Sequence, residues 1–241
     1  MVPLTLRSVL YEAGRPMRHV YFPADSIISI QFLLRDGGST AISIVGNEGL
    51  LGIGLFLGFE PASSRSLVQH SGHAYRLPKS LVKAEFDRHD ELMWLMLRYT
   101  QATISHVTQT AICNRHHSVF EQLCRWLLLT LDRLPHNQVT MTQEFISNTL
   151  GVRREGVTGA AAQLREAGII SYHRGVIDVL DRTALEKAAC ECYETVRSET
   201  EQILHYLPQR RAVLDDPVPV VKLPKSPAGE KRGAIARSNG S

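Results

Sequence analysis

The chain has 241 residues, of which 44% are hydrophobic and 21% charged, with a formal net charge of +3 at pH 7. This length suffices for one or two domains with their own cores, and the mildly basic balance permits nucleic-acid binding without requiring it. The N-terminus lacks the apolar run of a secretory signal, and the most apolar internal run, Leu92 to Leu97, is too short to span a bilayer. The sequence therefore predicts a cytoplasmic protein that has no membrane partner.

Residues 1–88 are predicted to form an antiparallel β-roll that acts as a sensor domain. From Ser26 to Leu34 apolar residues recur at every second position, the period of a strand with one buried face, formed here by Ile28, Ile30, Phe32 and Leu34. Residues 35–38 (Arg-Asp-Gly-Gly) are typical of a hairpin turn, because Asp and Gly tolerate positive φ. Further short strands are expected at 19–22, 39–45, 66–71 and 73–77, and such a series indicates a barrel or sandwich.

Residues 89–115 are predicted to form one long helix. Asp90 and Glu91 fall in its first turn, where the helix dipole favours acidic residues. Apolar or small residues then follow at alternating steps of four and three, the spacing of a coiled-coil seam. Such a seam favours a homodimer, and the alternative is an internal core helix. The predicted dimer interface consists of Met93, Leu97, Thr100, Ile104, Val107 and Ala111.

Residues 116–195 are predicted to form a winged helix-turn-helix domain, and residues 196–241 a helical extension with a basic, disordered tail. Within the domain, small Ser147 is followed by Gly151 four residues later and by Val157 six residues after that. This pattern suits two helices that cross closely over a turn with positive φ. The stretch 169–180 is predicted to be a two-stranded wing around a His-Arg-Gly turn.

The second helix of this motif begins near Arg153, and its N-terminal residues are expected to enter the major groove of DNA. Arginine can donate twice to guanine, and glutamate can accept from cytosine. Arg174, at the tip of the wing, is expected to contact phosphate. The predicted DNA-binding residues are Thr142, Arg153, Arg154, Glu155, Thr158 and Arg174.

These segments resemble the cyclic-AMP receptor protein/Fnr (Crp/Fnr) family of bacterial transcription regulators. The resemblance runs from about Leu10 to Tyr193 and is sharpest in TQEFISNTLGVRREGVT, AGIISYHRGVIDVLDR and GNEGLLGIGLFLG. It implies an α+β fold with a jelly-roll sensor domain, a long dimer helix and a C-terminal winged helix. Arg154 and Glu155 match the Arg-Glu pair with which family members contact bases. A further base-contacting arginine of the family falls on Gly159, which implies a different target sequence.

The sensor domain departs from the nucleotide-binding members of that family. Arg65 and Ser66 match the Arg-Ser pair that holds the cyclic phosphate and are the candidate effector-binding residues. The family's ribose-binding glutamate falls on Gly52 or Ile53, neither of which has an accepting side chain. A buried ribose hydroxyl without a partner costs about 1–3 kcal/mol. We therefore expect that cyclic AMP is not the effector.

The cysteines are expected to be reduced thiols, and no cofactor or metal is predicted. Iron–sulfur members carry N-terminal cysteines, but here none precedes Cys113. Cys113 and His116 could supply two ligands, with Cys124 as an uncertain third, whereas a structural zinc site needs four. Cys190 and Cys192, if both lie on a helix, would point apart.

The sequence predicts a sequence-specific transcription regulator that binds double-stranded DNA as a homodimer and contacts RNA polymerase. Two alternatives are a ligand-binding signalling protein whose helix-turn-helix contacts other proteins, and an enzyme that uses the region from Cys113 to Cys124. The enzyme is least favoured, because no nucleophile–base motif or phosphate-binding loop is present.

Overall fold

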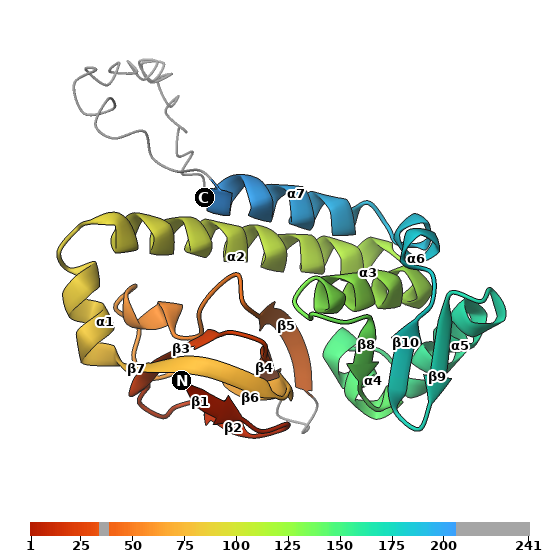
Figure 1. Cartoon of the computed structure of the whole chain (residues 1–241), viewed down its shortest axis with the longest axis horizontal. Helices are drawn as coiled ribbons and strands as arrows, with labels where there is room; N and C mark the ends of the chain where they lie inside the picture. Colours follow the sequence, from red (N-terminus) through yellow and green to blue (C-terminus); the bar gives the residue numbers. More distant parts are fainter. Residues whose placement is uncertain (34–38, 206–241) are drawn as a thin grey trace, which may run out of the picture. The chain divides into compact units, whose positions relative to one another are not determined.

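The computed structural model describes residues 1–33 and 39–205 of the chain. The predicted fold class is confirmed: an antiparallel β-roll, a long helix and a helix-turn-helix with a β-wing follow one another (Figure 1). The predicted turn at 35–38 and the predicted tail lie outside the described residues. No described helix is both long enough and apolar enough to cross a membrane.

The β-roll consists of two antiparallel sheets. One has the order β1-β7-β3 and the other the order β2-β6-β4-β5. A 3-10 turn, η1, follows the second sheet's edge strand. The bounds are β1 Val2–Leu4, β2 Val9–Tyr11, β3 His19–Pro23, β4 Ile27–Leu33, β5 Ser39–Val45, η1 Ile53–Leu55, β6 Arg65–His70 and β7 Gly72–Pro78.

The predicted alternation of buried and exposed residues in β4 is wrong, because Ile27, Ile28 and Ser29 are all buried. Ile28 is fully buried as predicted, but Phe32 is 40% exposed, whereas Gln31 is buried. The pairing of β4 with β5 shifts register between Ile30 and Gln31. A shift of one residue exchanges the two faces of a strand, which explains the exposure of Phe32.

Helices follow the roll, and the structure adds a third strand to the predicted wing. The helices are α1 Lys79–Phe86, α2 Glu91–His116, α3 Val119–Leu131, α4 Gln143–Leu150, α5 Arg154–Glu166, α6 Arg182–Ala188 and α7 Cys192–His205. The wing is a sheet of β8 Gln138–Thr140, β10 Val176–Val179 and β9 Ile170–His173, in that order. A capping box in which Ser118 and Glu121 satisfy each other's backbone N–H groups begins α3.

Helix α2 presents three different faces. One packs on the roll through Met96 and Tyr99, which belong to the roll's hydrophobic core. A second lies against α7, which runs beside α2 in Figure 1. A third is exposed and carries large apolar side chains, among them Trp94 and Ile104, which are 54% and 55% exposed. The long helix is therefore neither a purely internal core helix nor a freely solvated one.

The roll and the helix-turn-helix domain share a core at their junction. Ile27 and Ile44 of the roll pack in the same cluster as Leu123 and Leu127 of α3. Nearby, the largely buried Arg133 donates from Nε to Glu48 Oε1 over 2.8 Å, which links the end of α3 to the turn after β5. Apolar packing and an ion pair thus join the β-roll to the helix-turn-helix domain.

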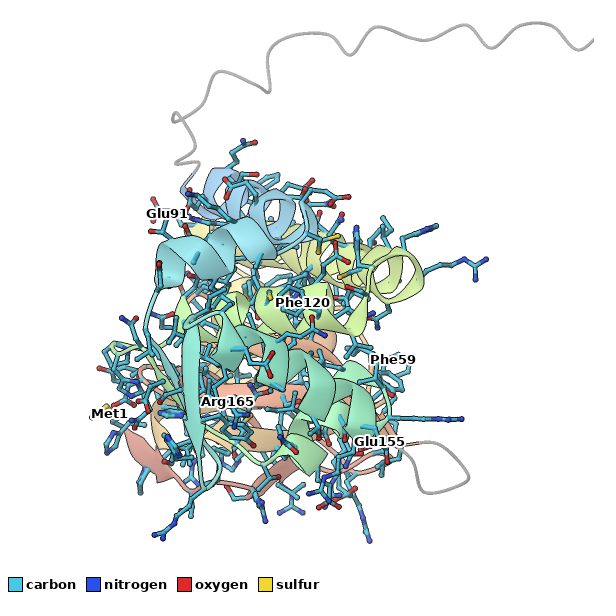
Figure 2. The ribbon with its side chains drawn as sticks, turned by 90° about the vertical axis from the view of Figure 1, so that its right-hand side faces the viewer. Met1, Phe59, Glu91, Phe120, Glu155 and Arg165 are labelled. Carbon is cyan, nitrogen blue, oxygen red and sulfur yellow. The ribbon has the colours of Figure 1, made fainter. Side chains whose placement is uncertain are left out.

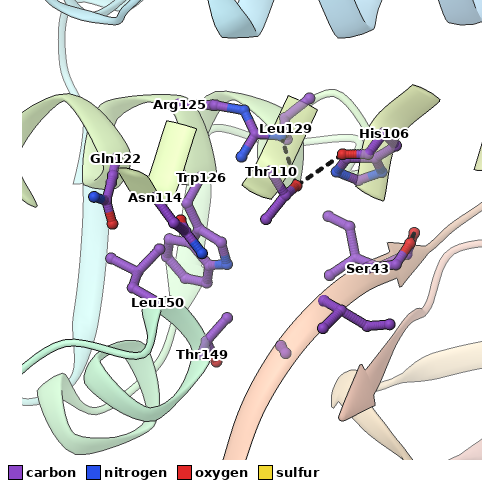
Figure 3. Close-up of a pocket in the computed structure, with 13 residues that line it drawn as sticks. Ser43, His106, Thr110, Asn114, Gln122, Arg125, Trp126, Leu129, Thr149 and Leu150 are labelled. Atoms are coloured by element: carbon purple, nitrogen blue, oxygen red, sulfur yellow. Dashed lines mark hydrogen bonds between the residues drawn. The ribbon is translucent and has the colours of Figure 1, made fainter. Parts of the chain in front are cut away.

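A small cavity of about 40 Å³ lies at this junction, between β5, α2, α3 and α4 (Figure 3). Arg125 donates to Thr110 Oγ1 over 2.9 Å at its edge. Burial lowers the pKa of His106 to about 3, with contributions from the charges of Arg133 and Arg125. His106 is therefore a neutral imidazole at physiological pH, and an ionic role for it is excluded.

Candidate nucleic-acid interface

The helix-turn-helix has the local geometry that its sequence predicts. Thr142 caps α4, because its hydroxyl accepts from the N–H of Phe145 over 3.2 Å. Gly151 ends α4 in the left-handed conformation, with φ of +68°. Ser147 is buried where α4 and α5 meet, and Val157 is fully buried between the helices. The small residue, the glycine and the valine therefore each have the predicted role.

The six predicted DNA-binding residues are all exposed. Arg153, Arg154 and Glu155 lie together at the N-terminal end of α5, where the helix dipole is positive. Figure 2 shows α5 between its labelled residues Glu155 and Arg165. Three long polar side chains project from one helix end, which is the part of a recognition helix that reaches base edges.

Thr158 and Thr142 also contribute to the structure of the motif. The Thr158 hydroxyl lies 2.9 Å from Gln143 Oε1, which joins the first turn of α5 to that of α4. By contrast, a Cβ added at Gly159 would meet no atom within 4 Å. Gly159 is therefore a gap in the outer surface of α5, where a larger side chain would fit without clashes.

The wing places Arg174 at its tip. Arg174 and Gly175 have φ of +49° and +83°, the signature of a tight turn that matches strand twist. At the base of the wing, the Tyr172 hydroxyl donates to Met141 O over 3.3 Å, and burial raises the pKa of that tyrosine. Arginine rarely adopts positive φ, so the turn holds a charged side chain where asparagine or glycine would be more usual.

The predicted dimer residues lie on the side of α2 that α7 leaves open. Leu97, Ile104 and Ala111 are exposed, while Met93, Thr100 and Val107 are half-buried. Sequence reasoning missed further apolar side chains beside them, although both are visible in the helical period. These are Trp94 and Ile112, which are 54% and 44% exposed.

The candidate effector residues do not form an open anion site. Arg65 Nε lies 3.4 Å from Glu12 Oε2, and Ser66 is 1% exposed. A Cβ at Gly52 would approach the Tyr11 hydroxyl to 2.7 Å, and Gly52 has φ of +121°. The Tyr11 side chain thus occupies the place that a ribose-binding glutamate would need.

Comparison with known proteins gives a domain type and a fold. Residues 121–188 match the family model described as a Crp-like helix-turn-helix domain. The structure resembles FixK2 from Bradyrhizobium japonicum (16% identity, TM-score 0.66) and TTHB099, a CRP-family transcriptional regulator from Thermus thermophilus (19% identity, TM-score 0.66). Each comparison covers 78% of this chain and 96% of the other.

A third similar structure is the c-di-GMP responsive regulator CLP from Xanthomonas campestris. It is 14% identical over 75% of this chain and 93% of its own, with a TM-score of 0.58. A comparison with curated protein sequences gave no match. The solved structures are less than 20% identical to this chain and therefore show its fold. The family-model match to residues 121–188 identifies the type of its DNA-binding domain.

Proposed function

We propose that this chain, a DNA-binding transcription regulator with a Crp-like helix-turn-helix domain and the Crp/Fnr fold, binds its operator as a homodimer. The observation that carries the proposal is the exposed Arg153-Arg154-Glu155 group at the N-terminal end of α5. The match of residues 121–188 to a Crp-like helix-turn-helix domain favours DNA over protein contacts as the role of this motif.

Selection of DNA from a random pool, followed by footprinting of the recovered sequence, tests this function directly. We expect two half-sites related by a two-fold axis, with centres about one helical turn or a multiple of it apart. The affinity should fall steeply with salt, because phosphate contacts release counterions. Recovery of no preferred sequence would contradict the proposal.

The homodimer is proposed to form through the exposed face of α2. Replacing Ile104 with glutamate should yield monomers at low micromolar concentration, because two like charges would meet across the two-fold seam. Sedimentation velocity measures the outcome. Leu81→Glu is the matched control, since Leu81 is 61% exposed on α1, away from this face. A dimeric Ile104→Glu variant would show that the seam is wrongly assigned.

The proposed effector is not a cyclic nucleotide. Calorimetric titration with cyclic AMP and cyclic GMP should show no binding at tens of micromolar, because the Tyr11 hydroxyl leaves no room for a side chain at Gly52 and Arg65 is paired with Glu12. A clear sub-micromolar isotherm would contradict this prediction. The ligand named for CLP belongs to that protein and does not identify the signal here.

The remaining parts of the proposal concern cellular context. A transcription regulator acts where DNA and RNA polymerase are found, so we infer a cytoplasmic protein that contacts RNA polymerase when bound to its operator. We also infer that it is not an enzyme, because its matched domain is a DNA-binding one.

A further inference from the structure

Three thiols and one imidazole lie close together at the N-terminal end of α7, although they come from two distant parts of the sequence. Cys113 comes from the end of α2, His117 from the residue after that helix, Cys190 from the connection between α6 and α7, and Cys192 from the start of α7. Cys113, Cys190 and Cys192 form a buried cluster of their own. The three sulfur atoms and a ring nitrogen of His117 all lie within 4.8 Å of one another.

Two distances within this group match the edges of a tetrahedral metal site, and every other pair of its ligand atoms lies within 4.8 Å. Cys113 Sγ and Cys190 Sγ are 3.7 Å apart, and Cys192 Sγ is 3.4 Å from His117 Nδ1. With Zn–S bonds of about 2.3 Å and Zn–N bonds of about 2.0–2.1 Å, the corresponding edges are about 3.8 Å and about 3.6 Å. We propose that Cys113, His117, Cys190 and Cys192 together bind a single Zn²⁺ ion in a closed structural site.

The surroundings supply what such a site needs beyond its four ligands. His117 Nε2 lies 3.3 Å from Glu191 Oε1, so that a carboxylate orients the imidazole and leaves Nδ1 free for the metal. Gln109 Nε2 donates to Cys192 Sγ over 3.0 Å. The buried Arg125 guanidinium interacts electrostatically with all three thiols.

The charges also balance. Binding of Zn²⁺ releases three thiol protons to solvent. The site of one Zn²⁺ ion, three thiolates and a neutral imidazole then has a net charge of −1. Arg125 provides a compensating positive charge in a region that water does not reach.

Two other cysteine chemistries fit the geometry less well. The 3.7 Å between Cys113 Sγ and Cys190 Sγ is well beyond the roughly 2.05 Å of a disulfide bond. An iron–sulfur cluster contains several irons and spreads its ligands around them, whereas these four ligand atoms all lie within 4.8 Å of one another. A mononuclear site that has one imidazole among thiolates is typical of zinc.

The site lies at the joint between the dimer helix and the DNA-binding domain. His117 is the C-cap of α2, its carbonyl accepts from Gln122 Nε2 over 2.9 Å, and α3 begins two residues later. On the other side, Cys192 is the first residue of α7. Zinc would therefore fasten the last helix of the DNA-binding domain to the end of α2.

Metal analysis of the untagged full-length protein, purified under reducing conditions, tests the site. We expect one zinc per chain. After removal of zinc, Co²⁺ should give the visible bands of a tetrahedral ion with thiolate charge transfer. In the zinc-bound protein, Cys113, Cys190 and Cys192 should resist alkylation, and a strong chelator should expose all three together. These measurements require no variant to fold.

Variants then assign the ligands. Cys190→Ser and Cys192→Ser should lose the zinc, whereas Cys124→Ser should keep it, because Cys124 is equally buried nearby but lies outside the group. Glu191→Gln should weaken zinc binding by about 10–100-fold through loss of the orienting carboxylate, with Glu194→Gln as the unchanged control.

The proposal is overturned if the reduced wild-type protein contains no zinc and takes up neither Zn²⁺ nor Co²⁺. It is equally overturned if Cys190→Ser retains a full equivalent, or if mass spectrometry of anaerobically prepared protein shows a Cys113–Cys190 disulfide. None of these results depends on DNA binding, so failure of the zinc site and failure of the regulatory function are distinguishable.

Discussion

Replacing Arg154 with alanine is expected to remove most of the preference for the operator over a DNA with altered half-sites. Arg154 is exposed in the first turn of α5, where a recognition helix approaches base edges. A bidentate arginine–guanine contact discriminates by about 1–3 kcal/mol, and a dimer makes it twice. Titrations of the operator and of the altered duplex at several salt concentrations measure the loss.

Arg174 provides the contrasting case. Because it has positive φ, the suitable neutral replacement is asparagine, which tolerates this conformation and preserves the turn. Arg174→Asn should weaken both duplexes in parallel and lower the salt slope by about one per subunit. Arg165→Ala, at the far end of α5, should change neither value. If Arg154→Ala also weakens both duplexes equally, Arg154 is a phosphate contact.

The second large effect is expected at the ion pair between the roll and the DNA-binding domain. Arg133→Met keeps the apolar stem but, among the described residues, leaves Glu48 with the Gly46 N–H as its hydrogen-bond partner. Breaking a fully buried pair costs roughly 3–5 kcal/mol, and we expect about 2–3 kcal/mol here because part of the carboxylate remains solvated. The Glu48 side chain is 19% exposed.

Urea unfolding measures this loss as a lower midpoint at unchanged slope. Combining Glu48→Gln with Arg133→Met should recover part of the stability, because no unpaired charge remains. Lys83→Met removes an exposed ion pair with Asp87 and is the control, with an expected change below about 1 kcal/mol. If Arg133→Met matches that control, the pair does not hold the two domains together.

The helices and the helix-turn-helix are predictable because their signals are local. Thr142, Ser147, Gly151 and Val157 act within one short segment, and each has a distinct backbone or packing role. The short strands β1, β2 and β8 have three residues each, too few to show a period. The register shift in β4 depends on its partner strand, so the exposure of Phe32 cannot be inferred from β4 alone.

The cysteine group shows where local reasoning fails. Cys190 and Cys192 are expected to diverge only if both lie on one helix. In the structure α6 ends at Ala188 and α7 begins at Cys192, so Cys190 lies in the non-helical connection and the two thiols can converge. The partner residues Cys113 and His117 are brought to them only by the packing of α7 on α2, and His117 takes the place that the sequence suggests for His116.

The three faces of α2 have a consequence for how this protein can vary. Each added residue turns the rest of a helix by about 100°, so a single insertion near Gln101 would rotate Ile104 away from a partner and Cys113 away from Cys190. A substitution on one face of α2 does not change the directions in which the other two faces point. The length of α2 is therefore far more constrained than its composition, because even an insertion of about seven residues, which nearly restores the angle, lengthens the helix by about 10 Å.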